Sequence, residues 1–242
     1  MTALWIISVI LKDASIVDLF WGLAFVISAW YAFSQTPDGD PARKLMVVIL
    51  VMIWGARLSL YLLWRNWGQG EDHRYRAFRQ RYGPERYWWV SFFQVFMLQG
   101  LVAWVISAPL LGAQIQGGQL NALDYLALIV WLIGFIFEAG SDLQLARFKA
   151  DPANKGRLLT SGFWHYSRHP NYFGDSAIWW AFGLLSLAAG SYLAAFGAVV
   201  MTVLIIRVSG VAMLERTLVK SKPTYAKYAR RTSSFIPWPP RD

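Results

Sequence analysis

Long apolar runs separated by short polar segments dominate the pattern of this chain. Runs of about twenty apolar residues have the length that an α-helix needs to cross the hydrocarbon core of a bilayer. They predict an all-α, polytopic transmembrane helical bundle with six full spans, at Ala14–Ser34, Leu45–Trp64, Val90–Leu111, Leu123–Leu145, Tyr172–Leu187 and Tyr192–Leu214. Residues 1–11 are apolar but too short to span, so we expect either a short interfacial helix or the second half of a truncated seventh span.

Composition and charge agree with a membrane protein. The 242 residues are 56% hydrophobic, and only 15% are charged, against about 25% in a typical soluble domain. The net charge of +9 comes from basic residues in three connections, at residues 65–87, 147–169 and after 214, which alternate with non-basic connections. The positive-inside rule therefore predicts that these connections and the C-terminus are cytoplasmic.

Several function classes are not expected from this sequence. No nucleic-acid-binding module accompanies the positive charge, so we expect no nucleic acid partner. The chain has no cysteine and only three histidines, without a His-x-x-x-His pair, so we predict no metal site. It also lacks a glycine-rich dinucleotide fingerprint and a P-loop, so any nucleotide would be held by helices and loops.

Polar residues crowd the segment that leads into the span at Tyr172. The run Ser161–Trp180 contains Arg168, His169, Asn171 and Asp175 beside apolar sequence. Pro170 suits the first turn of a helix, and free backbone N–H groups at a helix start attract anions. We interpret this segment as one wall of a cofactor site at the membrane surface. The alternative is that Asn171 and Asp175 cap and tether the helix while Arg168 and His169 face lipid headgroups.

Two carboxylates occupy the preceding span. Glu138 and Asp142 are four residues apart, so they share one helix face. Such groups are costly near a membrane unless they are paired or line a polar cavity. They could accept hydrogen bonds from ribose hydroxyls while Lys149 and Arg157 bind phosphate. The alternative is an interhelical salt bridge with Arg207 or another cation.

The N-terminal half contributes a second candidate pair. Asp18 and Arg57 lie in neighbouring spans, so they could form a structural ion pair or line a cavity where a proton donor meets a substrate carbonyl. At the other end of the chain, the basic and aromatic tail carries Tyr228. That tail could anchor the chain at the headgroup level or cover the cytoplasmic mouth of the cavity.

These residues also carry a resemblance to a known family. The segments SDLQLARFK, GRLLTSGFWHYSRHPNYFGD and RVSGVAMLERTLVKSKPTYAKYARRTSSFIPW resemble the C-terminal half of membrane steroid 5α-reductases. Together with WGLAF near Trp21 and WGARLSLYLLWRNWGQGEDHRY, they look closest to the bacterial DUF1295 group, over nearly the whole chain.

The resemblance implies a helical oxidoreductase in a bacterial inner membrane, with NADPH as cofactor. Such enzymes reduce a carbon–carbon double bond conjugated to a ketone in a hydrophobic substrate. The chain would be a single membrane domain, with a substrate half at about residues 1–120 and a cofactor half at about 121–242. The expected cofactor-binding residues are Arg57, Glu138, Asp142, Lys149, Arg157, Arg168, His169, Asn171, Asp175, Arg207 and Tyr228.

The substrate half departs from the steroid enzymes, which hold the ketone with a glutamate and a tyrosine. Asp18 lies near the place of the glutamate, Trp54 occupies the place of the tyrosine, and Tyr61 follows two turns later. We therefore expect Asp18 and Tyr61 to be the catalytic pair. The RHPNY sequence also resembles the isoprenylcysteine carboxyl methyltransferases, which bind S-adenosylmethionine, and a non-catalytic lipid-binding protein remains a third hypothesis.

Overall fold

The computed structural model describes residues 1–211, 214–215, 218 and 224–241, and within this part of the chain all regular structure is helical. The chain divides into two compact units, Met1–Gly118 and Gln119–Asp242. The helices of the first unit are α1 (Thr2–Leu11), α2 (Ile16–Leu19), α3 (Trp21–Gln35), α4 (Pro41–Asn66), α5 (His73–Tyr82), α6 (Pro84–Ser91), η1 (Phe92–Met97), α7 (Leu98–Ile106) and α8 (Ala108–Ile115). The second unit contains α9 (Ala122–Ala150), η2 (Pro152–Asn154), α10 (Phe163–Tyr166), α11 (Pro170–Ala188), η3 (Leu193–Ala195), α12 (Phe196–Val203), η4 (Leu204–Ser209) and α14 (Tyr225–Arg231).

Three helical stretches among the described residues are long and apolar enough to cross a membrane: α4, the run Pro84–Ile115, and α9. These candidate spans correspond to the predicted spans at Leu45–Trp64, Val90–Leu111 and Leu123–Leu145. Sequence features explain two of the helix starts. Asp40 accepts a hydrogen bond from the Arg43 amide with Pro41 in the first turn, and Asn121 with Asp124 forms a capping box before α9.

The other predicted spans form helices that are shorter or interrupted. The predicted span Ala14–Ser34 is broken at Phe20 into the one-turn α2 and the 15-residue α3. The last predicted span changes at Leu204 into the π-helix η4, which ends before Gly210, and part of its C-terminal end lies outside the described residues. The predicted span Tyr172–Leu187 corresponds to α11, which has 19 residues. The residues before Lys12 form α1.

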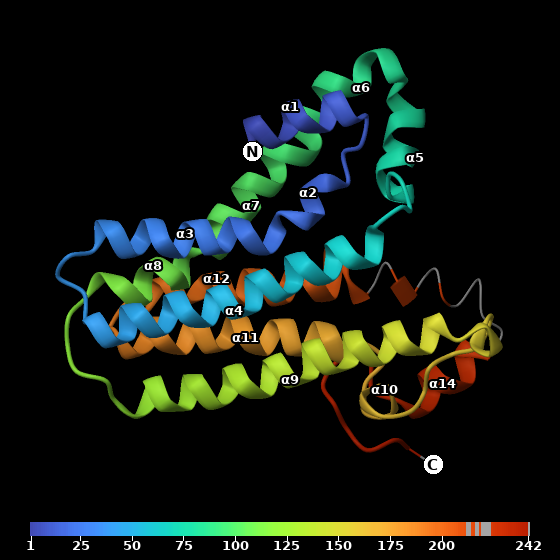
Figure 1. Cartoon of the computed structure of the whole chain (residues 1–242). Coiled ribbons are helices and arrows are strands. Elements are labelled where there is room, and N and C mark those ends of the chain that lie inside the picture. The colour runs from blue at the N-terminus through green and yellow to red at the C-terminus, as the bar shows by residue number, and fades with distance from the viewer. Residues whose placement is uncertain (212–213, 216–217, 219–223, 242) are drawn as a thin grey trace. The chain divides into compact units, whose positions relative to one another are not determined.

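In the first unit, α3 packs along α4, and α8 closes the group (Figure 1). α3 and α4 approach closely at Gly22 and Gly55, where a Cβ added to Gly22 would lie 2.4 Å from the backbone oxygen of Gly55. Small residues commonly permit such close contacts between membrane helices.

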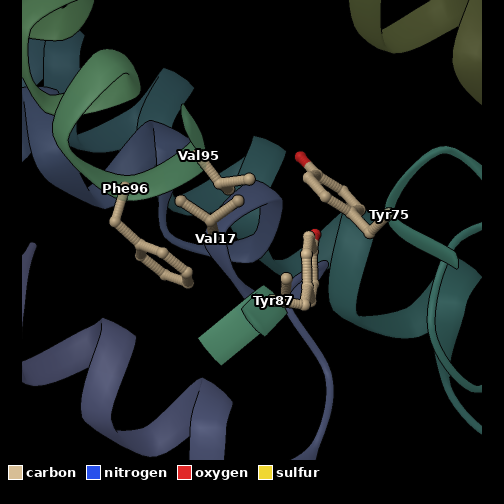
Figure 2. Close-up of a cluster of buried hydrophobic side chains, with 6 residues drawn as sticks. Val17, Tyr75, Tyr87, Val95 and Phe96 are labelled. Carbon is tan, nitrogen blue, oxygen red and sulfur yellow. The ribbon is translucent and has the colours of Figure 1, made fainter. Parts of the chain in front are cut away.

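A second core of the first unit joins α1 and α2 to the α5–η1 region. The buried residues of this cluster are Ala14, Val17, Tyr75, Tyr87, Val95 and Phe96, and Figure 2 shows the two tyrosine rings beside Val17 and Val95. α5 belongs to this core because Tyr75 and Phe78 lie three residues apart on one helix face. The arginine-rich connection predicted as a loop therefore contains a packed helix.

The second unit is organised by α9 and α11, which lie side by side over most of their length (Figure 1). Gly174 of α11 faces α9 so closely that an added Cβ would lie 2.4 Å from the Glu138 amide nitrogen and 2.5 Å from the Gly134 carbonyl oxygen. α12 packs on the same α11 helix. This close contact fixes the position of the polar residues at the N-terminal end of α11 relative to α9.

Candidate functional site

In the first unit, Asp18 is the centre of a hydrogen-bonded group contributed by three elements. Arg74 donates from Nη2 to one carboxylate oxygen at 2.6 Å, and the Tyr75 hydroxyl donates to the other oxygen at 2.7 Å. Gln99 of α7 donates in turn to the Tyr75 hydroxyl oxygen at 3.2 Å. The structure thus places a carboxylate and a phenol in direct contact.

Local structure explains why these side chains meet. Asp72 caps α5 by accepting from the Arg74 amide at 2.9 Å and from Arg74 Nε at 3.0 Å. The π-helix η1 lies two residues before Gln99, and such a π segment changes the face that later side chains present. α2 ends at Leu19, directly before the break at Phe20, so Asp18 belongs to a short helix that can turn toward α5.

A second ion pair fastens the start of α2 to α5. Glu71 is almost fully buried, and both of its carboxylate oxygens accept from Arg79, at 2.7 and 3.0 Å. Glu71 also accepts from the Ala14 amide at 2.9 Å. Arg79 further donates to the carbonyl of Lys12, a residue in the left-handed region at φ 54°. These contacts hold the α1–α2 turn, and therefore Asp18, in place.

Burial, followed by the negative charge of Asp18, raises the pKa of Tyr75 above its ordinary value. The phenol consequently keeps its proton at neutral pH. A hydroxyl in this state can donate to a carbonyl oxygen, which is the role of a general acid.

The expected catalytic residue Tyr61 lies on α4, where its ring contacts two arginines. The guanidinium carbons of Arg57 and Arg65 lie 6.0 and 5.7 Å from the ring centroid. Near the end of α4, a cavity of about 290 Å³ opens between α2 and the loop after α4. Its lining residues are Asp13, Ser15, Ile16, Leu19, Leu63, Asn66, Trp67, Gly68 and Gly70. Asp18 lies between Ile16 and Leu19 on α2.

In the second unit, the structure brings two predicted site residues together. The Asn171 side chain donates to Asp142 Oδ1 at 3.2 Å, from α11 to α9. Asp142 and Glu138 are both buried, with 7% and 4% exposed. α11 begins at Pro170 as predicted, and no side chain caps it. Asn171 therefore ties α11 to α9 and does not cap the helix, while Asp175 lies one turn further along α11.

Arg168 and His169 lie inside the protein, contrary to the alternative in which they face lipid headgroups. Arg168 Nη2 is 3.0 Å from Glu215 Oε1, and His169 Nε2 is 3.4 Å from the same oxygen. His169 is only 2% exposed and stacks on Tyr172. Glu215 lies more than forty residues after this segment in the chain, so no local sequence pattern links the two.

The C-terminal tail holds this segment from the other side. The Tyr228 hydroxyl donates to the carbonyls of Trp164 and Ser167, and the Arg168 amide donates to the Ser233 carbonyl at 2.8 Å. Tyr228 therefore positions the loop before α11. The remaining predicted cations, Lys149, Arg157 and Arg207, are exposed on α9, after η2 and on η4.

Some buried polar atoms of this region make no hydrogen bond within the described part of the chain. They include Arg168 Nε. Buried polar groups are normally satisfied by a partner. The region thus has donors and carboxylates suited to a polar ligand, and a ligand with both anionic and hydroxyl groups fits this donor set. No cluster of three or more metal-ligating side chains occurs in the described ranges.

A family model described as "Protein of unknown function (DUF1295)" matches residues 4–232. The chain belongs to the DUF1295 family. Among curated proteins, this DUF1295 chain is 27% identical to the uncharacterized protein C594.04c of Schizosaccharomyces pombe, over 97% of this chain and 75% of that protein. It is 37% identical over 76 residues to the probable O-methyltransferase ustE of Ustilaginoidea virens, a match that covers 31% of this chain and 26% of that protein. No solved structure matches.

The DUF1295 chain contains site residues that the sequence analysis missed, chiefly Arg74, Tyr75 and Gln99. A signal for α5 was present, since Tyr75, Phe78 and Tyr82 recur at helical spacing within the run HRYRAFRQRY. The number of arginines in that run obscured this apolar face. Gln99 gave no comparable signal, because its orientation depends on the π-helix before it.

Acidification is expected to destabilise this DUF1295 protein through His169. Burial lowers the pKa of His169 to about 4, against roughly 6.5 in an unfolded chain. Between these values the unfolded chain binds a proton that the folded chain does not. The free energy of unfolding should therefore fall with pH below about 6.5, by about 1.4 kcal/mol per pH unit and roughly 3 kcal/mol in all.

Thermal midpoints measured in detergent between pH 7 and pH 4 test this prediction. His169→Gln should flatten the dependence, whereas the matched change at the exposed His165 should leave it intact. The same slope in wild type and in His169→Gln would show that other groups cause the effect.

Proposed function

We propose that the protein is a membrane-embedded, NADPH-dependent reductase of a carbon–carbon double bond conjugated to a ketone in a hydrophobic, steroid-like or lipid substrate. The observation that carries this proposal is the contact between Asp18 and the protonated Tyr75, supported by Gln99. A positioned phenol beside a carboxylate can polarise a ketone oxygen. The resemblance of the cofactor half to the steroid 5α-reductases supports the choice of reaction.

In this mechanism Tyr75 donates its hydrogen bond to the substrate carbonyl oxygen in place of Asp18. Gln99 keeps the phenol oriented by donating to its oxygen. Arg74 holds the Asp18 carboxylate through the ion pair. The negative charge of Asp18 therefore stays compensated when the Tyr75 hydroxyl turns to the substrate. Polarising the carbonyl makes the β-carbon electrophilic. The hydrogen bond from Tyr75 would then stabilise the negative charge that develops on the carbonyl oxygen as an enolate. Tyr61 remains a predicted catalytic residue that would face the substrate from α4.

The second unit would hold the cofactor, and NADPH bound there would supply the hydride. Asp142, Asn171, Glu138 and Asp175 are suited to ribose hydroxyls and the amide. The phosphate groups would be bound by cations, for which the predicted candidates are Lys149, Arg157, Arg168 and Arg207. Tyr228 and His169 would act mainly by holding the loop before α11, and Arg57 stays a predicted cofactor-binding residue.

We further propose that the chain spans the bacterial inner membrane six times, with α1 as a short additional helix and the basic connections cytoplasmic. The 19 residues of α11 would be roughly 28 Å long at the rise of an α-helix, close to the thickness of the hydrocarbon core. The interrupted helices α2–α3 and α12–η4 would cross where their polar groups are covered by protein. The substrate would enter from the membrane and take part in lipid metabolism.

A second candidate is an S-adenosylmethionine-dependent membrane methyltransferase. The partial similarity to a probable O-methyltransferase favours it. The Arg168–Glu215 pair also offers one cation and one carboxylate, which would suit the amino and carboxylate groups of that cofactor.

Cofactor titration separates the two candidates. NADPH at about a hundred times its dissociation constant should stabilise the purified protein by roughly 2.7 kcal/mol and raise its melting temperature by several degrees. Asn171→Ala should weaken this effect without loss of the folded protein, while the matched Asn66→Ala variant should behave like wild type. Stabilisation by S-adenosylmethionine alone would replace the reductase by the methyltransferase, and no response to either would favour a non-catalytic lipid-binding protein.

A further inference from the structure

α5 presents two faces of different chemistry. Its inner face carries Tyr75, Phe78 and Arg79, which are buried or half-buried. Its outer face is mostly polar, with His73, Arg76, Ala77, Gln80 and Arg81 exposed. The spacing of the outer residues, at steps of three and four, keeps them on one side of the helix.

In this region two carboxylates are paired with arginines, whereas several other arginines face outward. The acidic residues Glu71 and Asp72 are engaged by Arg79 and Arg74. In contrast, Arg76, Arg81 and Arg86 are exposed and make no ion pair in the part of the chain that the structure describes. Glu85, in the first turn of α6, is an exposed carboxylate among them, so the three arginines leave the outward-facing surface of the α5–α6 segment with a net positive charge.

Exposed tryptophans accompany these cations in the same unit. Trp64 and Trp67 stand at the end of α4, with 65% and 76% exposed, and Trp88 and Trp89 belong to α6, with 51% and 46% exposed. Tryptophan is enriched at the level of lipid headgroups. Residues 67–83 also connect two helices that are long and apolar enough to span, so the connection must emerge at a membrane surface.

We propose that the outer face of α5 and the start of α6 form a docking surface for anionic phospholipid headgroups, with Arg76, Arg81 and Arg86 as the binding cations and the four tryptophans as interfacial anchors. Charge complementarity selects this occupant, since cationic side chains near an anionic leaflet bind it electrostatically. Headgroups bound here would stabilise α5, whose inner face holds Tyr75. Any effect of this stabilisation on catalysis through Tyr75 rests on the proposed function, whereas the lipid binding does not.

Quenching by brominated lipids tests the surface directly. The protein is reconstituted in bilayers of phosphatidylcholine and phosphatidylglycerol, with bromine placed on the acyl chains of one lipid or the other. Tryptophan fluorescence then reports which lipid is enriched beside the protein. Wild type should prefer phosphatidylglycerol, and the variant R76Q/R81Q/R86Q should lose most of that preference, by about fivefold for each arginine. High salt should reduce the wild-type preference.

A variant with the same loss of charge provides the control. K227Q/R230Q/R231Q removes three exposed cations from α14 and should retain the wild-type preference for phosphatidylglycerol. The substituted arginines have exposed side chains, so both variants are expected to fold. Absence of any preference in wild type, or an equal loss in both variants, would overturn the proposal. Neither measurement involves NADPH, so the result is independent of the proposed reaction.

Discussion

Replacing Tyr75 by Phe is expected to lower kcat by roughly 10²–10⁴-fold, the usual contribution of a positioned general acid. The substitution keeps the ring that packs in the cluster of Val17, Val95 and Phe96, and it removes only the hydroxyl that bonds Asp18 and Gln99. Asp18 retains its ion pair with Arg74, so the cost in stability should be about 1 kcal/mol. Turnover of NADPH with an enone substrate, together with the dissociation constant of NADPH, measures the two effects separately.

Tyr82→Phe is the matched control, because Tyr82 lies on the same helix with its ring 36% exposed. It should leave turnover unchanged.

Asp18→Asn should reduce kcat more than cofactor affinity, since it weakens the group that orients the phenol. If Tyr75→Phe binds NADPH normally and retains wild-type kcat, the proton donor lies elsewhere, and Tyr61 becomes the next residue to test.

The helices that form the long spans could be predicted from hydrophobic length alone. α4, the run Pro84–Ile115 and α9 follow directly from runs of apolar residues bounded by Asp40, Gly83 and Asn121. The break at Phe20 and the π-helix at Leu204 could not be predicted in this way. Neither contains a proline, the usual sequence signal for an interrupted helix.

Part of the candidate site in the second unit was also accessible from the sequence. Pro170 marks the start of α11, and the spacing of Glu138 and Asp142 places both on one face of α9. The contact between Asn171 and Asp142 is consistent with a shared site. The role of Glu215 was not accessible, because a sequence pattern does not specify which distant carboxylate will compensate a buried arginine.

The site of the first unit shows the opposite outcome. Asp18 was predicted as a functional carboxylate, but its partner comes from a connection that the charge pattern presents as a solvent-exposed loop. Asp72 gives the helix start and Tyr75 with Phe78 gives the inner face, so local rules suffice to predict α5. Its docking onto α2 depends on the Glu71–Arg79 pair and the Ala14 amide, which are long-range contacts without periodicity.

Gly174→Ala is expected to cause the largest loss of stability of any single methyl addition in α11. The new Cβ would lie 2.4 Å from the Glu138 amide nitrogen and 2.8 Å from its Cβ, and 2.5 Å from the Gly134 carbonyl oxygen. Two of these neighbours are backbone atoms of α9, which cannot rotate away, so the helices must separate. Overpacking of this kind typically costs about 1–3 kcal/mol and occasionally more. Because α11 also carries Asn171, separation should lengthen its hydrogen bond to Asp142 and weaken ligand binding in parallel.

Gly183→Ala on the same helix provides the comparison, because its added Cβ would meet Ala198 at 3.4 Å and otherwise only atoms at 3.9 Å. That is ordinary contact, and alanine has the higher helix propensity, so the variant should melt at or above the wild-type temperature. Thermal unfolding of both variants in detergent, with and without NADPH, measures the difference. Equal melting temperatures for the two variants would mean that α9 and α11 leave room for a methyl group at Gly174. The placement of Asn171 against Asp142 would then have to be revised.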